Sequence, residues 1–227
     1  MKNQSLNRVW WVVMLIALVG GAAWAQDETP AQAGEQVGVM GTFVRVAENQ
    51  EGWVVLGYRA ANGAVGKNWM MLDVGITLQK GVKDQTLTRD KLNLVNPAHE
   101  VLPLATQEEY GKAAGELAAM ERADAMMNDS INYFPPETDQ PCRIGFFADP
   151  MQRARALAFD QVDIRWRAAC VGRLFFQVPG GIQLGTYNLD VKLDGSVIRV
   201  PIDIMTEEQA KEFEKKWKEA EKEAKKK

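Results

Sequence analysis

Apolar and polar residues alternate with a period of two in two regions of the chain, residues 37–104 and 142–204. The clearest example is the segment 72–78, LDVGITL, in which every second residue is aliphatic. This alternation predicts a β-strand with one buried face, because successive side chains of a strand point to opposite sides. Similar runs predict strands at residues 41–47, 53–60, 92–94, 101–104, 143–148, 162–166 and 173–178. Their short spacing, with turn residues in the gaps, predicts a mainly β fold of the sandwich or barrel type.

The strongest local signal is a hairpin near the end of the second region. Residues 187–193 and 198–204 both alternate, and the dipeptide Asp194-Gly195 lies between them. A D-G dipeptide in this position predicts a two-residue type I′ turn, in which both central residues have positive φ. Pro201 has no amide to donate to a neighbouring strand, so we expect its strand at a sheet edge or a bulge.

Two capping boxes, TQEE and TEEQ, predict the starts of two helices. The first box begins a helix near residues 106–128, which would be inserted between the two β regions. The second begins a helix over residues 206–227, which contain eight Lys and seven Glu and have a narrow apolar stripe. We expect its first turns to dock through Phe213 and Trp217, while most of its surface is solvated.

Composition and charge exclude several classes of protein. The chain has 227 residues, of which 46% are hydrophobic and 25% charged, as in a folded domain with a substantial core. One His and two Cys cannot supply the four ligands of a zinc site made only of these residues. The net charge of -3 argues against a general nucleic-acid binder, which needs a basic face. We therefore predict no metal, no cofactor and no nucleic-acid partner.

The N-terminus predicts export. Two basic residues precede an eleven-residue apolar run at 9–19, and Ala23-Trp24-Ala25 matches the cleavage pattern of a signal peptide. The alternative is a membrane anchor, but crossing the hydrocarbon core takes about 20 apolar residues. We predict a signal peptide at residues 1–25, a flexible leader at 26–36, and a periplasmic or extracellular protein without a transmembrane segment after cleavage.

Cys142 and Cys170 are the two cysteines of the chain. An even number of cysteines in an exported protein predicts a disulfide. The bridge would close a loop of 29 residues and stabilise the fold by about 3–4 kcal/mol through loop-closure entropy. A reactive thiol pair is the alternative, although the C-x-x-C spacing typical of such pairs is absent.

The sequence contains little that indicates catalysis. His99 lies among turn residues without a G-x-S-x-G or comparable motif, and we interpret it as a surface residue. Asp149, Asp160 and Asp163 lack the close alternation of ligands and the turn glycine of a calcium loop. Paired carboxylates for glycoside hydrolysis depend on tertiary structure, which leaves that chemistry open. We predict that the protein has no catalytic residues and is not an enzyme.

Two sets of residues are candidates for binding a partner. Arginine suits bidentate binding of carboxylate or phosphate, so arginines near the cysteines could form an anion-binding patch. These residues are Arg143, Arg153, Arg155, Arg165, Arg167 and Arg173. The alternative is a solvated face neutralised by nearby Asp residues. Likewise, Trp53, Trp69 and Trp166 could form an aromatic platform for a glycan or belong to the core.

Two segments resemble bacterial extracellular immunoglobulin-like domains. Residues 69–105 resemble their succession of an alternating strand, a short loop, an acidic residue before alternating apolar positions, and a return strand. Residues 172–179, GRLFFQVP, resemble the Phe-x-Val-Pro strand of these domains. The matching positions are Leu72, Val74, Ile76, Leu78, Asp90, Leu92, Leu94, Leu102, Pro103, Leu104, Phe176, Val178 and Pro179.

The resemblance implies an immunoglobulin-like β-sandwich over residues 37–205, with an inserted helix and a charged C-terminal helix. It also implies a binding or structural role in the cell envelope, and no catalytic residues carry over. We therefore predict a non-catalytic exported protein that binds a protein or an envelope polymer. The alternatives are a hydrolase acting on envelope polymers and a structural subunit of an envelope assembly. A deep pocket with converging carboxylates would favour the hydrolase, and a flat patch of arginine and aromatic residues would favour binding.

Overall fold

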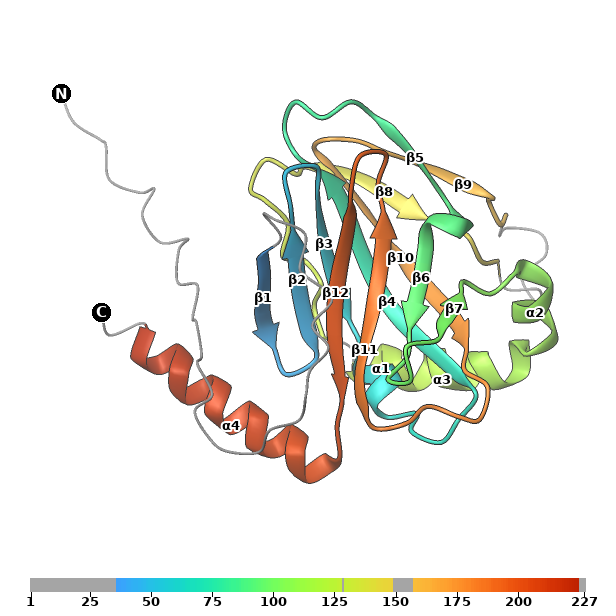
Figure 1. Ribbon diagram of the computed structural model, residues 1–227, viewed down its shortest axis with the longest axis vertical. Helices are drawn as coiled ribbons and strands as arrows, with labels where there is room; N and C mark the ends of the chain where they lie inside the picture. The colour runs from blue at the N-terminus through green and yellow to red at the C-terminus, as the bar shows by residue number, and fades with distance from the viewer. Residues whose placement is uncertain (1–35, 128, 149–156, 225–227) are drawn as a thin grey trace.

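The computed structural model describes residues 36–127, 129–148 and 157–224. The predicted signal peptide, the leader up to residue 35, and Asp149, Arg153 and Arg155 lie outside the described residues. The described chain is mainly β, with several sheets and a C-terminal helix (Figure 1). None of its helices combines the length and apolar character that a membrane-spanning helix requires.

The described strands form a six-stranded, a four-stranded and a two-stranded sheet. The six-stranded sheet contains, in spatial order, β1 (Gln36–Gly41), β2 (Val44–Glu48), β3 (Gly52–Gly57), β4 (Trp69–Leu78), β10 (Ala168–Gln177) and β8 (Gln140–Ile144). The four-stranded sheet contains β12 (Val197–Ile204), β11 (Gly185–Lys192), β6 (Leu92–Val95) and β7 (Val101–Pro103). The third sheet pairs β5 (Gln85–Thr88) with β9 (Gln161–Ile164). Strand pairs are antiparallel except β8 and β10, which run parallel.

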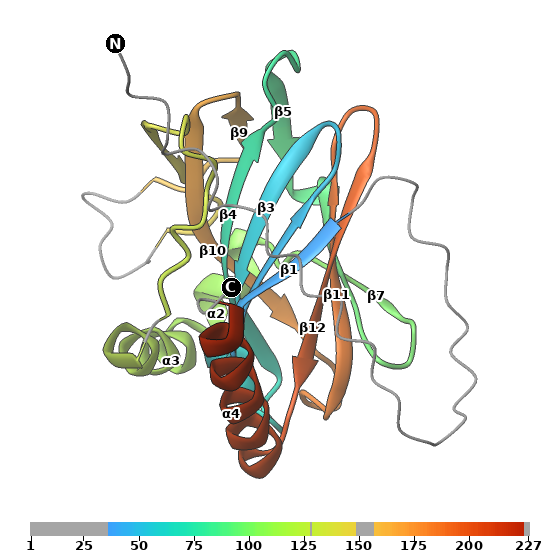
Figure 2. The ribbon, with the colours of Figure 1, turned by 90° about the vertical axis from the view of Figure 1, so that its left-hand side faces the viewer.

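The two larger sheets face each other across one apolar core (Figure 2). Aliphatic residues from both sheets are completely buried there, among them Ile76 of β4, Leu189 of β11 and Ile202 of β12. Removing this apolar surface from water is the main favourable contribution to folding. A bridge between Leu104 and Phe176 also connects the two sheets at one side.

The outer face of the six-stranded sheet is covered, which corrects the prediction of a single buried face for residues 72–78. Both faces of β4 are buried. The segment 131–134 lies over part of the outer face, and the ring of Phe134 would be 2.5 Å from a Cβ atom at Gly75. Figure 2 shows α3 (Ala114–Met127) on the same outer side. Strand alternation alone does not reveal such a cover.

The described structure also contains four α-helices, which are α1 (Arg59–Asn62), α2 (Gln107–Lys112), α3 and α4 (Glu207–Ala224). A short 3-10 helix, η1 (Arg89–Lys91), precedes β6. The capping box of α2 is confirmed, since Thr106 accepts from the Glu109 amide and the Glu109 carboxylate accepts from the Thr106 amide. The capping box of α4 is confirmed in the same way for Thr206 and Gln209. The helical segment predicted near 106–128 is divided into α2 and α3.

The predicted hairpin of β11 and β12 is confirmed, and β12 lies at a sheet edge as expected for Pro201. The type I′ turn is wrong, because neither Asp194 nor Gly195 has positive φ. The last register pair is Lys192 with Val197, and the Leu193 amide donates to the Ser196 carbonyl at 2.8 Å, so Asp194 and Gly195 form the tip of the loop. Side chains from elsewhere stabilise this loop, since the Asp194 amide donates to Gln85 and the Gly195 amide to Glu51.

Candidate interaction site

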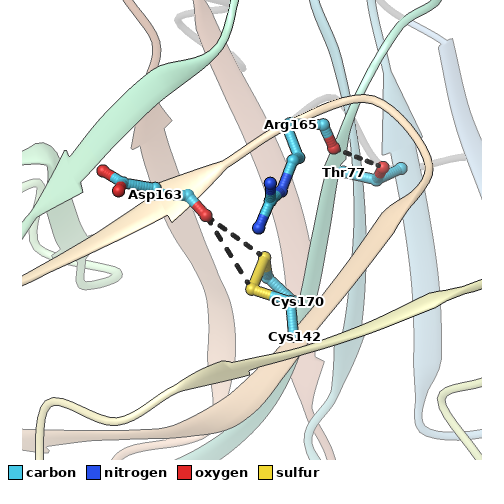
Figure 3. The surroundings of a disulfide bond; sticks show 5 residues. All are labelled: Thr77, Cys142, Asp163, Arg165 and Cys170. Carbon is cyan, nitrogen blue, oxygen red and sulfur yellow. Dashed lines mark hydrogen bonds between the residues drawn. A yellow bond between two sulfur atoms is a disulfide. The ribbon is translucent and has the colours of Figure 1, made fainter.

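The predicted disulfide between Cys142 and Cys170 is confirmed. The two cysteines are register partners on the parallel strands β8 and β10, and Cys170 is completely buried (Figure 3). Both sulfur atoms lie 3.8 Å from the carbonyl oxygen of Asp163 in β9. The bridge therefore ties the edge strand β8 to the sheet at the end of the molecule where β9 turns into β10.

The turn between β9 and β10 consists of Arg165, Trp166 and Arg167, and we call it the Trp166 turn. Arg167 has a φ of 71°, a left-handed conformation that a non-glycine residue seldom adopts. The backbone is fixed on two sides, because the Arg167 carbonyl accepts from Gln140 at 2.9 Å and the Arg165 carbonyl accepts from Thr77 at 3.4 Å. The turn is thus held by both β4 and the strand that carries Cys142.

Cationic side chains surround the ring of Trp166. The Lys80 ammonium lies 5.6 Å from the ring centroid and the Arg167 guanidinium 5.7 Å from it, both within the range of cation–π attraction. Lys80 and Arg165 are exposed. Figure 3 shows the Arg165 side chain pointing towards the disulfide.

Acidic residues neutralise only part of this charge. Arg167 forms a bidentate ion pair with Asp139, and this hydrogen bonding lowers the pKa of the Asp139 carboxyl group. Because β5 pairs with β9, the loop between β4 and β5 lies beside the turn and contributes the exposed Lys83 and Asp84. The result is an exposed, mainly basic surface around one aromatic ring.

The structure brings together only part of the predicted arginine set. Arg165 and Arg167 share the Trp166 turn, whereas Arg173 lies on the outer face of the six-stranded sheet, in ion pairs with Asp73 and Asp124. Arg143 is exposed on β8. Sequence proximity therefore did not translate into one surface, because strand alternation and the β9–β10 turn separate these side chains.

The predicted tryptophan platform is also divided. Trp69 is buried in the core, and the Trp53 indole donates to the carbonyl of Tyr133 at 2.9 Å. Only Trp166 lies beside exposed cations in this set. Lys80, which belongs to a loop far away in sequence, was missed because nothing in its local sequence indicates its contact with Trp166.

Of the other candidate residues, Asp163 lies in β9 directly before the Trp166 turn, whereas His99 and Asp160 lie outside it. His99 is exposed in the loop between β6 and β7 and has a φ of 63°. Asp160 lies 4.0 Å from Arg89, and Asp163 accepts a hydrogen bond from Thr86. Within the described residues, no three His, Cys, Asp or Glu side chains are grouped so that they could hold a metal ion.

An open groove of about 620 Å³ lies between α1, α4 and the start of β2 and was not predicted. Arg59 lies in it, 4.6 Å from the ring centroid of Phe43, and pairs with Asp129. Its two acidic lining residues, Glu207 and Glu214, form ion pairs along α4, and lysines lower the pKa of both carboxyl groups. These carboxylates therefore do not have the raised pKa of a general acid.

Comparison with known proteins gives no relative: no family model matches the chain, and neither a curated protein nor a solved structure is similar to it.

Proposed function

We propose that the protein is a non-catalytic, exported binding module of the bacterial cell envelope, and that its Trp166 turn binds an anionic envelope polymer. The observation that carries this proposal is the contact of Lys80 and Arg167 with the ring of Trp166, on a turn that also exposes Arg165 and is tied to two strands. Cations held in position lose little conformational freedom on binding, which increases affinity for an anion.

A polymer suits this surface better than a single small anion. The exposed cations come from two neighbouring loops, and a chain with repeated carboxylate or phosphate groups can contact several of them together. The aromatic ring adds an apolar contact for a sugar. Such binding is electrostatic at an exposed surface, so it weakens as the salt concentration increases.

Export and the immunoglobulin-like sandwich are part of the same proposal. A disulfide is typical of proteins in oxidising compartments, which supports export. Two facing sheets with a shared core support a sandwich. The parallel pair of β8 and β10 departs from the antiparallel sheets of an immunoglobulin domain, so the proposed relationship is one of architecture.

The first prediction concerns Trp166→Ala in the full exported chain. We expect binding to polygalacturonate, a polyanionic sugar polymer, to weaken by about tenfold, because the ring no longer positions Lys80 and Arg167. Binding is measured by isothermal titration calorimetry at low and moderate salt. Trp217→Ala on α4 is the matched control and should bind as the unmodified protein does.

Neutral dextran tests whether the charge of the polymer is required. Because dextran has no anionic groups, we expect it not to bind. Equal affinity of Trp166→Ala and the unmodified protein would contradict the proposed surface. Release of reducing ends from an envelope polymer would instead support the alternative of a hydrolase.

A further inference from the structure

α3 packs on the outer face of the six-stranded sheet through a group of charged residues. Asp73 of β4 and Arg173 of β10 are register partners on this face, and their side chains lie 3.2 Å apart. From α3, Asp124 lies 3.3 Å and Glu121 3.9 Å from the Arg173 guanidinium. We call these four residues the α3 cluster.

The carboxyl groups of the cluster are shielded from water. The Asp124 side chain is 1% exposed and that of Asp73 12%. On the β3 side, the residue opposite Asp73 is Gly57, which has no side chain and therefore no charge. Burial of ionised groups is unfavourable unless opposite charges and hydrogen bonds compensate for it.

The charges around the cluster do not balance. Its three carboxyl groups face one guanidinium, that of Arg173. Two further charges act on Asp124, those of Arg59 on α1 and Asp129 after α3, and these residues form an ion pair with each other at 2.9 Å. From α2, the Tyr110 hydroxyl donates to Glu121 and adds no charge at neutral pH.

A shared proton reduces this excess of negative charge. Asp73 and Asp124 contact neighbouring nitrogen atoms of the same guanidinium, Nε at 3.2 Å and Nη2 at 3.3 Å, so a proton on one carboxyl group can be donated to the other. Burial, together with the neighbouring Asp124, raises the pKa of Asp73 to about 6, although Arg173 opposes the shift. Burial also raises the pKa of Asp124. The two groups titrate as a coupled pair.

Few apolar contacts hold α3 in place. Leu117 is completely buried and Met120 packs partly against the core, while Met126 is 87% exposed. A helix with so small an apolar contact depends strongly on the remaining interactions, and such elements open at low free energy. The state of the charged cluster can therefore decide whether the helix stays docked.

We propose that α3 is a proton-dependent latch, which is closed while Asp73 and Asp124 share a proton and loosens from the sheet when that proton is lost. In the open state, water hydrates both carboxyl groups and their pKa values return towards those of exposed residues. The closed state thus binds the proton more tightly, and increasing pH favours the open state. The extra stability of the closed state is complete below the ordinary pKa of Asp and is lost as pH rises through about 6.

Opening would uncover a defined region of the molecule. Tyr110 of α2 packs against Phe175 of β10 with ring centroids 4.9 Å apart, beside the position of α3. The segment 131–134, which covers the outer face of β3 and β4, follows α3 in the chain. Movement of α3 therefore connects the protonation of two carboxyl groups to the exposure of an aromatic surface.

Hydrogen exchange tests the latch. Peptides from residues 114–127 are compared at about pH 5 and about pH 8 by mass spectrometry, after correction for intrinsic exchange rates. We expect protection of α3 to be lower at the higher pH by roughly tenfold or more, as a pKa shift above one unit requires. Peptides from β12 serve as an internal reference and should keep their protection.

Asp73→Asn separates the latch from a general effect of pH. The amide can still donate to Asp124 but carries no charge, so α3 should be equally protected at both pH values. Asp163→Asn is the matched control, because Asp163 is an exposed carboxylate that also accepts a hydrogen bond, and this variant should keep the pH dependence. A pH dependence that persists in Asp73→Asn would overturn the proposal.

A titration of the unmodified protein tests the latch without any substitution. Carbonyl-detected nuclear magnetic resonance follows each aspartate, and we expect one carboxyl group at this cluster to titrate near pH 6. Titration of every aspartate below about pH 5 would exclude the shared proton and hence the latch.

Discussion

At the scale of single residues, Gly172 is the glycine of the described sheets at which a side chain would have the least space. It lies in β10 next to the parallel strand β8, and a Cβ atom there would overlap the carbonyl oxygen of Ile144. Because the obstacle is backbone, a side-chain rotation cannot relieve it. We expect Gly172→Ala to reduce the free energy of unfolding by about 3 kcal/mol, measured by urea denaturation.

Gly111→Ala provides the control for this substitution. Gly111 lies in α2, and a Cβ atom there would have no neighbour within 4 Å. Alanine in a helix should stabilise the protein by about 0.5–1 kcal/mol. If both variants shifted the urea midpoint equally, the close approach of β8 and β10 would be refuted.

At the scale of elements, α4 docks mainly at its first turns. Arg45, which is buried, lies between the rings of Tyr58 and Phe213, at 5.1 and 5.3 Å from their centroids. Deletion of residues 212–227 removes Phe213 and exposes Arg45, so we expect a loss of about 1 kcal/mol while the sheets stay folded. Circular dichroism with thermal unfolding measures both effects.

A shorter truncation, of residues 218–227, keeps Phe213 and Trp217. Most of the described side chains at 218–223 are exposed, and the ion pair of Lys218 with Glu214 that the truncation removes contributes little. We expect this variant to unfold at the same temperature as the complete chain. Global unfolding of the longer truncation would show that α4 is an integral part of the core.

Elements with a local cause were predictable from the sequence. The two capping boxes and the hairpin of β11 and β12 are confirmed, because hydrogen bonds between near neighbours and strict alternation determine them. The type I′ turn is wrong because Gln85 and Glu51, far away in sequence, accept from the Asp194 and Gly195 amides and stabilise a loop without positive φ. β5 was not predicted, because Leu87 is the one apolar residue in its sequence, QTLT, and a single apolar residue shows no alternation.

At the scale of the whole molecule, the contacts that form the candidate site join segments far apart in sequence. Arg165, Arg167 and Trp166 were candidates from the sequence, but their grouping with Lys80 depends on the pairing of β5 with β9. The covered outer face of β4 depends likewise on α3 and on residues 131–134. Periodicity identifies a buried face but not a second layer that is contributed by a later segment.

The disulfide acts at this largest scale, because it fixes the one parallel strand pair of the described sheets. β8 lies at an edge and pairs only with β10, so its position depends on the bridge more than that of an inner strand does.

In the Cys142→Ala/Cys170→Ala variant, we expect the free energy of unfolding to be lower by about 3–4 kcal/mol, measured by urea denaturation. Hydrogen exchange should increase first in β8, since the inner strands keep neighbours on both sides. Since the Trp166 turn is bonded to Gln140 of β8, the same variant should also bind polygalacturonate more weakly. Unchanged protection of β8 in the variant would show that strand pairing alone holds this edge.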